Sequence, residues 1–388
     1  MASRSAVKKE KIDKPRFSFW AKGKMDILFV VILVILLTIG LVMLFSASYV
    51  YAYNKFGDSF KFIKQQLVFA IAGIGAMFVT SKIDYHVYKK LAWPIYIGIV
   101  ILLGVMLLLP PMISGVDYKR WIVLGPINFQ PSEIAKFAIV LLFAFLIERN
   151  QKKMQNFGFG FVFFLVLLGI VCGLVVLEPH LSATVLIFFI GITLMFVGGT
   201  RKLYLLASGG IVGGLGAIVL FSGVFGYWLD RFKYWFDPWL DAQGKGFQTI
   251  QSLLAIGSGG FLGRGLGQSR QKYLWVPEPH NDFIFSIVCE ELGFIGAMLI
   301  VVLFCLLVWR GLTIAMHAKD KFGGMLALGL TFQVGLQALL NILVVTNTIP
   351  NTGISLPFFS YGGTSMLILL AEMGIVLSVS RSSRLPKS

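Results

Sequence analysis

Long apolar runs alternate with short polar segments along almost the whole chain of 388 residues. Most of the runs have roughly the 17–25 residues that a helix needs to cross the hydrocarbon core of a bilayer. We therefore expect an all-α, polytopic membrane protein with about ten transmembrane helices. Their expected ranges are 26–47, 66–81, 91–111, 131–147, 159–177, 181–198, 203–224, 283–309, 324–348 and 362–380.

The segments between the apolar runs predict how the chain is organised. The longest of them, 225–282, is too short and too close to the helices to suggest a second soluble domain. We expect a basic cytoplasmic tail at 1–25, a ten-helix domain at 26–381 and a cytoplasmic tail at 382–388. Segment 225–282 forms a large extracytoplasmic loop between helices 7 and 8. The first run is too long for a signal-peptide core and is expected to stay as an anchor.

Composition agrees with this class of protein. Of all residues, 57% are hydrophobic and 13% are charged, whereas about 25% are charged in a typical soluble domain. Cys172, Cys289 and Cys305 all fall in apolar runs. This placement predicts neither a disulfide framework nor a thiolate metal site.

The net charge of +16 is distributed in a way that orients the helices. If the N-terminus is cytoplasmic, every loop on its side carries at least two Lys or Arg residues, such as Lys152 and Lys153. The positive-inside rule then places both termini in the cytoplasm. The basic excess therefore reflects membrane topology, and we do not expect a nucleic-acid partner. The loops on the outer side are 48–65, 112–130, 225–282 and 349–361.

Common catalytic motifs are missing from the sequence. There is no Walker A motif, no GxSxG and no HExxH, so neither a nucleotide nor a hydrolytic nucleophile is expected. His180 and His280 have no metal-ligand spacing between them. The glycine-rich stretch 257–272 contains Arg264, Arg270 and Lys272. Its positive charge suits a phosphate group at the membrane surface, and a solvated loop explains it equally well.

Charged residues inside the apolar runs are the main candidates for function. A charge at the bilayer centre costs about 2.5–3.5 kcal/mol even on mild scales, so such residues usually face a cavity. Glu133 and Lys136 are three residues apart on one helix face and can pair. Asp282 lies at the mouth of the eighth run, within "VPEPHNDFIF" (276–285). Buried ion pairs that fix helix register are the alternative for this whole group, which also includes Glu290, Glu291 and Glu372.

These residues describe a site at the membrane surface that opens outward. A carboxylate stands at its mouth, cationic loops surround it, and no nucleotide motif accompanies it. A lipid-linked anionic substrate fits this chemistry, and so does an ion-coupled transporter. The residue types alone do not separate the two.

Five motifs in a fixed order narrow the choice. They are "RWIVLGPINFQPSEIAK" (120–136), "EPHLSAT" (178–184), "GKGFQTIQSLLAIGSGGFLGRGLGQSRQK" (244–272), "VPEPHNDFIFSIVCEELG" (276–293) and "PNTGISLPFFSYGGTS" (350–365). Over about 26–381 the chain resembles the SEDS family, which contains FtsW, RodA and SpoVE. The second motif departs from the commoner form, which has Asp where His180 stands, so we expect no acidic role at that position.

The resemblance implies a peptidoglycan glycosyltransferase with ten transmembrane helices. Such an enzyme polymerises lipid II, an undecaprenyl-pyrophosphate-linked substrate, on the outer face of the bacterial cytoplasmic membrane. The family implies a class B penicillin-binding protein as partner. The details of the motifs favour the division or sporulation branch of the family. That branch implies septal wall synthesis, with other divisome membrane proteins as further partners. No nucleotide is expected, and a divalent cation, Mg²⁺ or Mn²⁺, remains open.

Residue roles carry over only where the motifs match. Asp282 matches the essential aspartate of the family, the proposed general base. Glu133 and Lys136 match residues that line the central cavity, and Trp121 matches a tryptophan needed for activity. The roles of Glu278 and His280 in the fourth motif stay open. The departing pyrophosphate needs positive charge from a divalent ion or from one of Arg120, Arg231, Lys272 and Lys136.

Two other functions remain on the basis of the sequence. A lipid II flippase would use Glu290, Glu291 and Glu372 as a path and would need no catalytic base. A scaffold that only recruits the penicillin-binding protein would tolerate replacement of Asp282.

Overall fold

The computed structural model describes residues 19–21, 23–109, 120–124, 127–207, 209–210 and 226–383, and within these ranges the chain is almost wholly helical. The main helices are α1 (Ile27–Phe56), α2 (Lys61–Lys82), α3 (Val87–Leu108), α4 (Pro131–Arg149), α5 (Phe164–Leu177), α6 (Leu181–Gly198), α8 (Gly226–Phe236), α9 (Phe247–Gly259), α10 (Ile284–Met316), α11 (Lys321–Val345) and α12 (Gly363–Ser382). The smaller elements are β1 (Ile122–Leu124), β2 (Ile127–Phe129), η1 (Gln151–Lys153), the π-helix η2 (Phe157–Phe163) and η3 (Pro238–Asp241).

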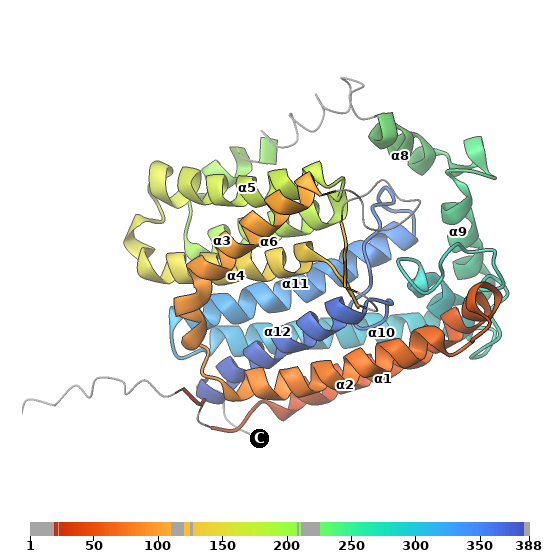
Figure 1. The fold of residues 1–388 in the computed structure, drawn as a ribbon, viewed down its shortest axis with the longest axis horizontal. Helices are drawn as coiled ribbons and strands as arrows, with labels where there is room; N and C mark the ends of the chain where they lie inside the picture. Colours follow the sequence, from red (N-terminus) through yellow and green to blue (C-terminus); the bar gives the residue numbers. More distant parts are fainter. Residues whose placement is uncertain are drawn as a thin grey trace, which may run out of the picture.

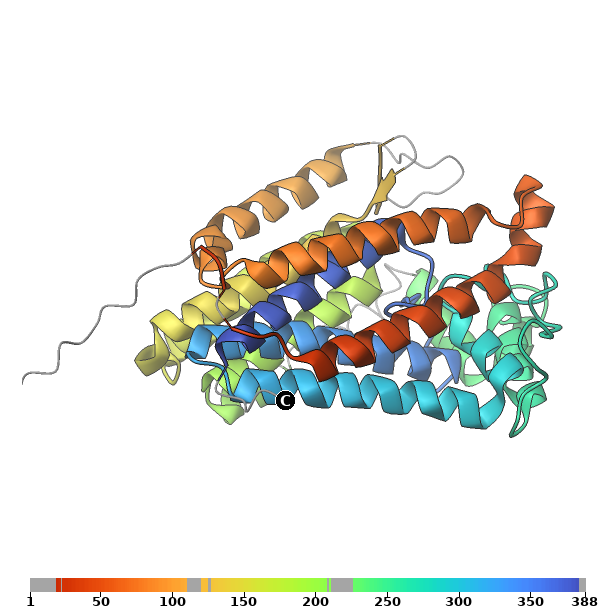
Figure 2. The ribbon, with the colours of Figure 1, turned by 90° about the horizontal axis from the view of Figure 1, so that it is seen from below.

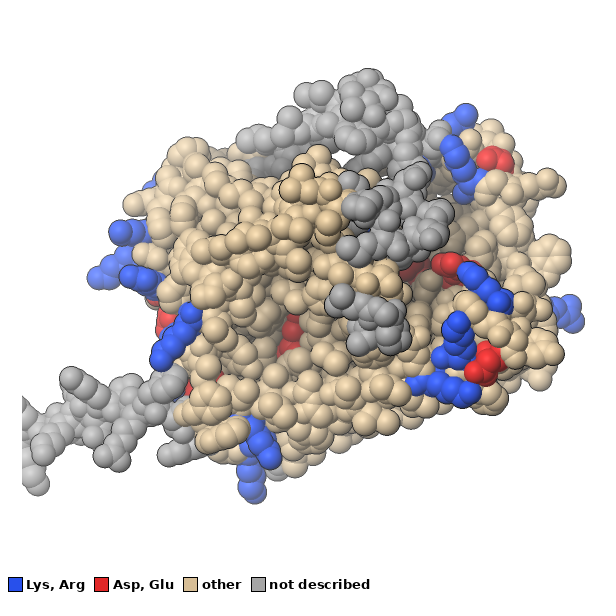
Figure 3. All heavy atoms as spheres, in the orientation of Figure 1, with Lys and Arg blue, Asp and Glu red and all other residues tan. Residues whose placement is uncertain are grey.

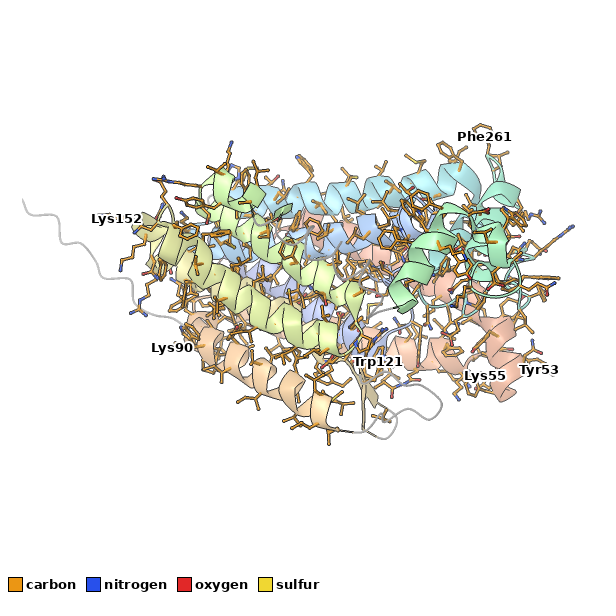
Figure 4. All side chains as sticks on the ribbon, turned by 90° about the horizontal axis from the view of Figure 1, so that it is seen from above. Tyr53, Lys55, Lys90, Trp121, Lys152 and Phe261 are labelled. Atoms are coloured by element: carbon orange, nitrogen blue, oxygen red, sulfur yellow. The ribbon has the colours of Figure 1, made fainter. Side chains whose placement is uncertain are left out.

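The long helices form one bundle with roughly aligned axes, while α8 and α9 stand at one end of it (Figures 1 and 2). α12 packs against α2, α10 against α11, and α3 against α4. α4 also contacts α6 and α11, which places it in the interior of the bundle. Lys90 and Lys152 lie at one end, which we name the basic end (Figure 4). Lys55 lies at the opposite end, which we name the cavity end.

The ends of α1 show how local chemistry sets the bounds of a helix. The Asp26 carboxylate accepts a hydrogen bond from the backbone N–H of Phe29 at 2.9 Å, which satisfies one of the unpaired amides of the first turn. The same carboxylate forms a 2.7 Å ion pair with Arg310 of α10. Gly57 ends the helix with φ of 73°, a left-handed conformation that glycine adopts without a steric penalty. The cap thus also fixes α1 against α10.

The surface of the bundle is suited to a bilayer. Eight of the described helical segments are long and apolar enough to cross a membrane. α4 has the length but carries charged residues in its first and last turns. Figure 3 shows Lys and Arg gathered toward the two ends, with a broad band between them that is almost free of charge. The expected class, an all-α polytopic membrane protein, is confirmed.

The observed helices follow the expected ranges closely in some places and extend beyond them in others. α6 has the predicted bounds, whereas α1 runs nine residues past the predicted end at 47. The loop expected at 225–282 contains the helices α8 and α9. Most of the expected span 203–224 and most of the two terminal tails lie outside the described residues.

The span expected at 283–309 is present in α10, but α10 breaks at Gly293. Gly293 has φ of 67° and ψ of −170°, which no helix contains. Residues 284–292 therefore form a short leg, and 294–316 form a long leg of about 35 Å at 1.5 Å per residue. The long leg alone suffices to cross a bilayer. Glu290 and Glu291 belong to the short leg.

The segment that follows α9 satisfies the backbone groups that the break exposes. Arg264 N–H donates to Glu290 O at 3.0 Å, and Gly265 N–H donates to Glu291 O at 3.0 Å. On the other side of the break, Phe294 N–H donates to Gly260 O at 2.9 Å. In a membrane such groups have no water to bond, so a broken helix is stable only where protein supplies partners. The glycine-rich stretch is that partner.

Replacing Gly293 by alanine is expected to destabilise the protein by at least about 1–3 kcal/mol, the usual cost of a strained backbone conformation. A Cβ atom at this position would also lie 2.6 Å from Phe261 O and meet the backbone of Gly263. The measurement is thermal unfolding in detergent. The matched control is Gly257→Ala, because nothing lies within 4 Å of a Cβ there. Equal melting temperatures for the two variants would contradict this account of the break.

Candidate functional site

A cavity of about 550 Å³ opens at the cavity end of the bundle. This volume is in the usual range for small-molecule sites, about 300–1,000 Å³. Its walls come from the ends of α1 and α2, the β1–β2 segment, the start of α4, the α5–α6 turn and the loops before α10 and α12. Its acidic, basic and histidine lining residues are Lys55, Arg120, Glu133, Lys136, His180, Glu278, His280 and Asp282. Segments that are distant in sequence, from α1 to α12, therefore meet around one polar space.

Asp282 lies in this cavity, two residues before α10 begins. The side-chain amide of Asn341 on α11 donates hydrogen bonds to Asp282 O at 2.7 Å and to Ile354 O at 2.6 Å. Gly353 has φ of 72°, and a Cβ atom there would lie 3.1 Å from Asp282 Oδ2. A glycine at 353 therefore meets two needs, a left-handed turn and room for the carboxylate.

The surroundings of Asp282 favour its protonated form. Burial raises the pKa of this carboxyl from an ordinary 3.8 to about 6, and the negative charge of Glu278 adds to the rise. The positive charges of Arg120 and Arg231 act in the opposite direction. A carboxylate with a raised pKa accepts protons more readily, as general-base catalysis requires.

Glu133 and Lys136 form the ion pair that their spacing predicts. Glu133 Oε1 and Lys136 Nζ are 2.9 Å apart, and the lysine is almost fully buried. Lys136 also donates to Gln337 Oε1 at 2.9 Å. Gln337 in turn donates to Ser355 O at 3.1 Å, so the ammonium group is connected to the loop before α12.

Sequence reasoning missed three amide side chains on α11. Gln333, Gln337 and Asn341 are spaced four residues apart, which puts them on one helix face. Gln333 donates to Glu372 Oε2 at 2.9 Å, so each amide holds a different polar element. Three amides at this spacing within an apolar run were the signal that could have identified them.

Arg120 and Trp121 precede β1 and line the cavity beside the α5–α6 turn. Arg120 donates to the carbonyl oxygens of Pro179 and, at 3.4 Å, Glu178. Burial raises the pKa of Glu178 to about 8, and the charge of Arg120 limits the rise. The backbone of the motif at 178–184 thus positions Arg120 of the motif at 120–136.

His180 is a neutral part of the wall. Burial and the positive charges of Arg120 and Lys136 lower its pKa to about 3. Its Nδ1 lies 3.3 Å from Ser132 Oγ, and its ring lies 3.4 Å from the Gln130 amide. The imidazole is therefore neutral at physiological pH.

His280 packs at the mouth of the cavity. Its ring lies 4.2 Å from the Phe62 ring centroid and 4.9 Å from that of Tyr51. Burial, with the charge of Lys55, lowers its pKa to about 4, so it is neutral at physiological pH. Glu278 lines the mouth and accepts a 2.9 Å hydrogen bond from Asn281.

The loop before α12 holds the Asp282 segment in place. Ser360 Oγ donates to Asn281 O at 2.8 Å, and Tyr361 N–H donates to His280 O at 2.9 Å. These contacts give the fifth motif (350–365) an architectural role beside the candidate base.

Two predicted site residues lie outside the lining of this cavity. Lys272 is fully buried and forms a 2.8 Å ion pair with Glu291, so its charge is neutralised. Ser46 of α1 also donates to Glu291, at 2.8 Å to Oε1. Arg231 lines a separate pocket and donates to Asn351 O.

Glu290 and Glu291 hold the glycine-rich stretch onto the short leg of α10. Glu290 Oε1 accepts from Arg270 N–H at 2.9 Å, and Glu291 Oε2 accepts from Gly267 N–H at 3.0 Å. The alternative that these carboxylates fix local structure is therefore the one that their contacts favour.

The fold and the cavity define a class, a polytopic helical membrane protein with a carboxylate site at one end. The family model described as "Cell cycle protein", FtsW/RodA/SpoVE, matches residues 26–385. The chain belongs to this family.

Relatives match over nearly the full length. The chain is 40% identical over 361 residues to "Probable peptidoglycan glycosyltransferase FtsW" of Geobacter sp. (strain M18), covering 92% of this chain and 97% of the relative. It is 41% identical over 370 residues to "Stage V sporulation protein E" of Bacillus subtilis (strain 168), covering 94% and 99%.

Solved structures are similar as well. One chain belongs to a structure described as "Structural coordination of polymerization and crosslinking by a peptidoglycan synthase complex". It has a TM-score of 0.77 and 29% identity, covering 93% of this chain and 99% of that one. The rod shape determining protein RodA of Thermus thermophilus has a TM-score of 0.68 and 27% identity, covering 93% and 98%.

Lys272→Met is expected to destabilise the protein by about 3–5 kcal/mol, because it leaves the Glu291 carboxylate buried without its cation. The double variant Lys272→Met with Glu291→Gln should recover much of this loss, since no unpaired charge remains. Thermal unfolding of the single and double variants measures the difference. A stable Lys272→Met protein would mean that the pair is not structural.

Proposed function

We propose that the protein is a peptidoglycan glycosyltransferase that polymerises lipid II. The names of its relatives support the activity. The observation that carries the site is the Asp282 carboxylate, which lies in a polar cavity and has a raised pKa. Asn341 holds the backbone carbonyl of the same residue. We further propose that the basic end faces the cytoplasm, as the positive-inside rule predicts, so that the cavity opens at the outer surface.

The proposed chemistry is one glycosyl transfer per turnover. The 4-hydroxyl oxygen of one sugar attacks the anomeric carbon of another, and Asp282 accepts the hydroxyl proton. The bond from that carbon to the pyrophosphate oxygen breaks, and the lipid pyrophosphate leaves with the electron pair. Base catalysis of this kind contributes roughly 10²–10⁴-fold. The pyrophosphate linkage supplies the free energy, so no nucleotide is needed.

The cavity narrows the choice of cation for the departing pyrophosphate. Arg120 and Lys136 line it, whereas Lys272 is paired with Glu291 elsewhere. We assign the stabilisation of the departing pyrophosphate to the positive charges of Arg120 and Lys136. In the described part of the chain no three His, Cys, Asp or Glu side chains group as metal ligands. Mg²⁺ is usually held by one or two carboxylates together with substrate phosphates, so the divalent cation stays a prediction, and no step here runs through it.

We propose a class B penicillin-binding protein as partner, with septal wall synthesis and other divisome proteins as the cellular setting. The similarity to a chain of a peptidoglycan synthase complex supports such a partner. A flippase would use Glu290, Glu291 and Glu372 as a path. Glu290 and Glu291 are engaged in holding a loop, and Glu372 accepts a hydrogen bond from Gln333. Their contacts favour the glycosyltransferase.

Asp282→Asn is expected to abolish polymer while the protein folds. Folding raises the pKa of Asp282, so its ionisation costs stability as pH rises from about 4 to about 6, and asparagine removes this cost. The assay gives labelled lipid II to the purified protein with its partner and resolves glycan ladders on a gel. Ladders from Asp282→Asn would remove Asp282 from the role of base. The absence of ladders from the wild type with its partner bound would favour a flippase or a scaffold.

The rate of polymerisation is expected to fall as pH drops through about 6, because protonated Asp282 cannot accept the hydroxyl proton. Glu278→Gln removes a negative charge that raises the Asp282 pKa, so the acidic limb should move to lower pH. Initial rates from about pH 5 to 8 for both proteins provide the test. An acidic limb that stays in place in Glu278→Gln would contradict the assignment of that limb to Asp282.

A further inference from the structure

Glu372 lies beneath the cavity, and the proposed chemistry does not use it. Met366 and Leu369 of α12 line the cavity, and Glu372 follows three residues after Leu369 on the same helix. Gln333 lies one turn before Gln337 on α11, and of these two only Gln337 lines the cavity. Glu372 is 3% exposed and Gln333 is 1% exposed. The two side chains therefore meet in a closed polar layer between α11 and α12, which lie side by side in Figure 1.

Glu290 and Glu291 show what an ionised glutamate has around it when it is buried in this bundle. Glu290 accepts a hydrogen bond from Arg270 N–H at 2.9 Å and lies 3.8 Å from Arg264 Nε. Glu291 forms a 2.8 Å ion pair with Lys272. Both are almost fully buried, so a nearby cation and several hydrogen-bond donors offset the cost of removing their charge from water.

Glu372 has a different set of partners. Its Oε2 accepts one hydrogen bond from Gln333 Nε2 at 2.9 Å. Its Oε1 and the Oε1 of Gln333 are both buried and have no hydrogen-bond partner in the described part of the chain. An ionised carboxylate leaves both oxygens unpaired, because neither can donate. A protonated carboxyl group supplies a donor, and an acid and a primary amide can then exchange two hydrogen bonds.

The charges around Glu372 also favour the neutral acid. The charged groups that act on it are Lys136 and Glu133, both on α4. The described residues of α2, α10, α11 and β2, which also pack against α12, supply no charge that acts on it. Lys136 is already paired with Glu133 at 2.9 Å. An ionised Glu372 would give two carboxylates to one cation and leave a net negative charge inside the bundle.

We propose that Glu372 holds a proton in the folded protein, with Gln333 as its partner, and that this neutral pair is a positioning element for Lys136. A neutral Glu372 leaves the ammonium group of Lys136 to Glu133, Gln337 and the cavity. An ionised Glu372 would attract that ammonium group and weaken its stabilisation of the departing pyrophosphate. The role at Lys136 rests on the proposed function, whereas the proton on Glu372 does not.

The first test makes the same substitution at two buried glutamates. Glu372→Gln should keep the melting temperature, because the new amide N–H donates where the acid O–H did. Glu290→Gln is the matched control and should lower it. Both oxygens of Glu290 accept from backbone N–H groups, so an NH₂ group in either orientation faces a donor. Thermal unfolding in detergent measures the two variants. Equal losses in melting temperature would overturn the proposal.

The second test detects the proton by infrared spectroscopy of the full-length protein. An exposed glutamate is ionised at about pH 7. At this pH the wild type should show a carbonyl-stretch band of a protonated carboxylic acid that Glu372→Gln lacks and Glu290→Gln keeps. Identical bands for protonated acids in the wild type and Glu372→Gln would mean that Glu372 is ionised, against the proposal.

The third test concerns the role at Lys136. On the alkaline side, ionisation of Glu372 should slow polymerisation of labelled lipid II by the wild type with its partner, and Glu372→Gln should keep its rate to higher pH. Coincident alkaline limbs would remove Glu372 from the positioning of Lys136. A wild type that makes no ladders would contradict the proposed function instead, and the unfolding and infrared results would still decide where the proton lies.

Discussion

The side-chain amide of Asn341 joins the two loops that form the cavity. Its Nδ2 donates to Asp282 O and to Ile354 O, at 2.7 and 2.6 Å. Both carbonyls lie at the end of an apolar bundle, where an unbonded carbonyl is costly. The position of the Asp282 carboxylate therefore depends on one α11 side chain, supported by the bonds of Ser360 and Tyr361 from the opposite loop.

The need to hydrogen-bond every backbone group also explains how the other segments at the cavity end are arranged. α10 can break at Gly293 because the glycine-rich stretch bonds its exposed backbone groups, and Glu290 and Glu291 hold that stretch from the other side. The break separates the short leg from the long leg of α10, and Asp282 lies two residues before the short leg begins. A charged cluster at the membrane surface is thus built from segments that satisfy one another.

The sequence predicts the helices well because hydropathy and length alone decide them, and α6 begins and ends where the apolar pattern does. It also predicts the Glu133–Lys136 pair, since both residues lie within one helical turn. It does not predict the Gly293 break, because glycine inside a membrane helix usually serves helix packing. The sequence also does not predict that Lys272 lies outside the cavity lining. Its partner Glu291 lies nineteen residues away, and only the tertiary fold brings them together.

A glycosyl transfer that uses a carboxylate base and a pyrophosphate leaving group makes opposite electrostatic demands. The base needs a raised pKa, whereas the leaving group needs nearby cations, and these cations would lower the pKa of the base. The cavity reduces this conflict through the partners of its cations. Lys136 is paired with Glu133 at 2.9 Å, whereas Arg120 is oriented by the neutral carbonyls of Glu178 and Pro179. Glu278, on the side of Asp282, offsets the positive charge at the base itself. In the proposed mechanism, these different partners let one cavity keep a proton acceptor and an anion site.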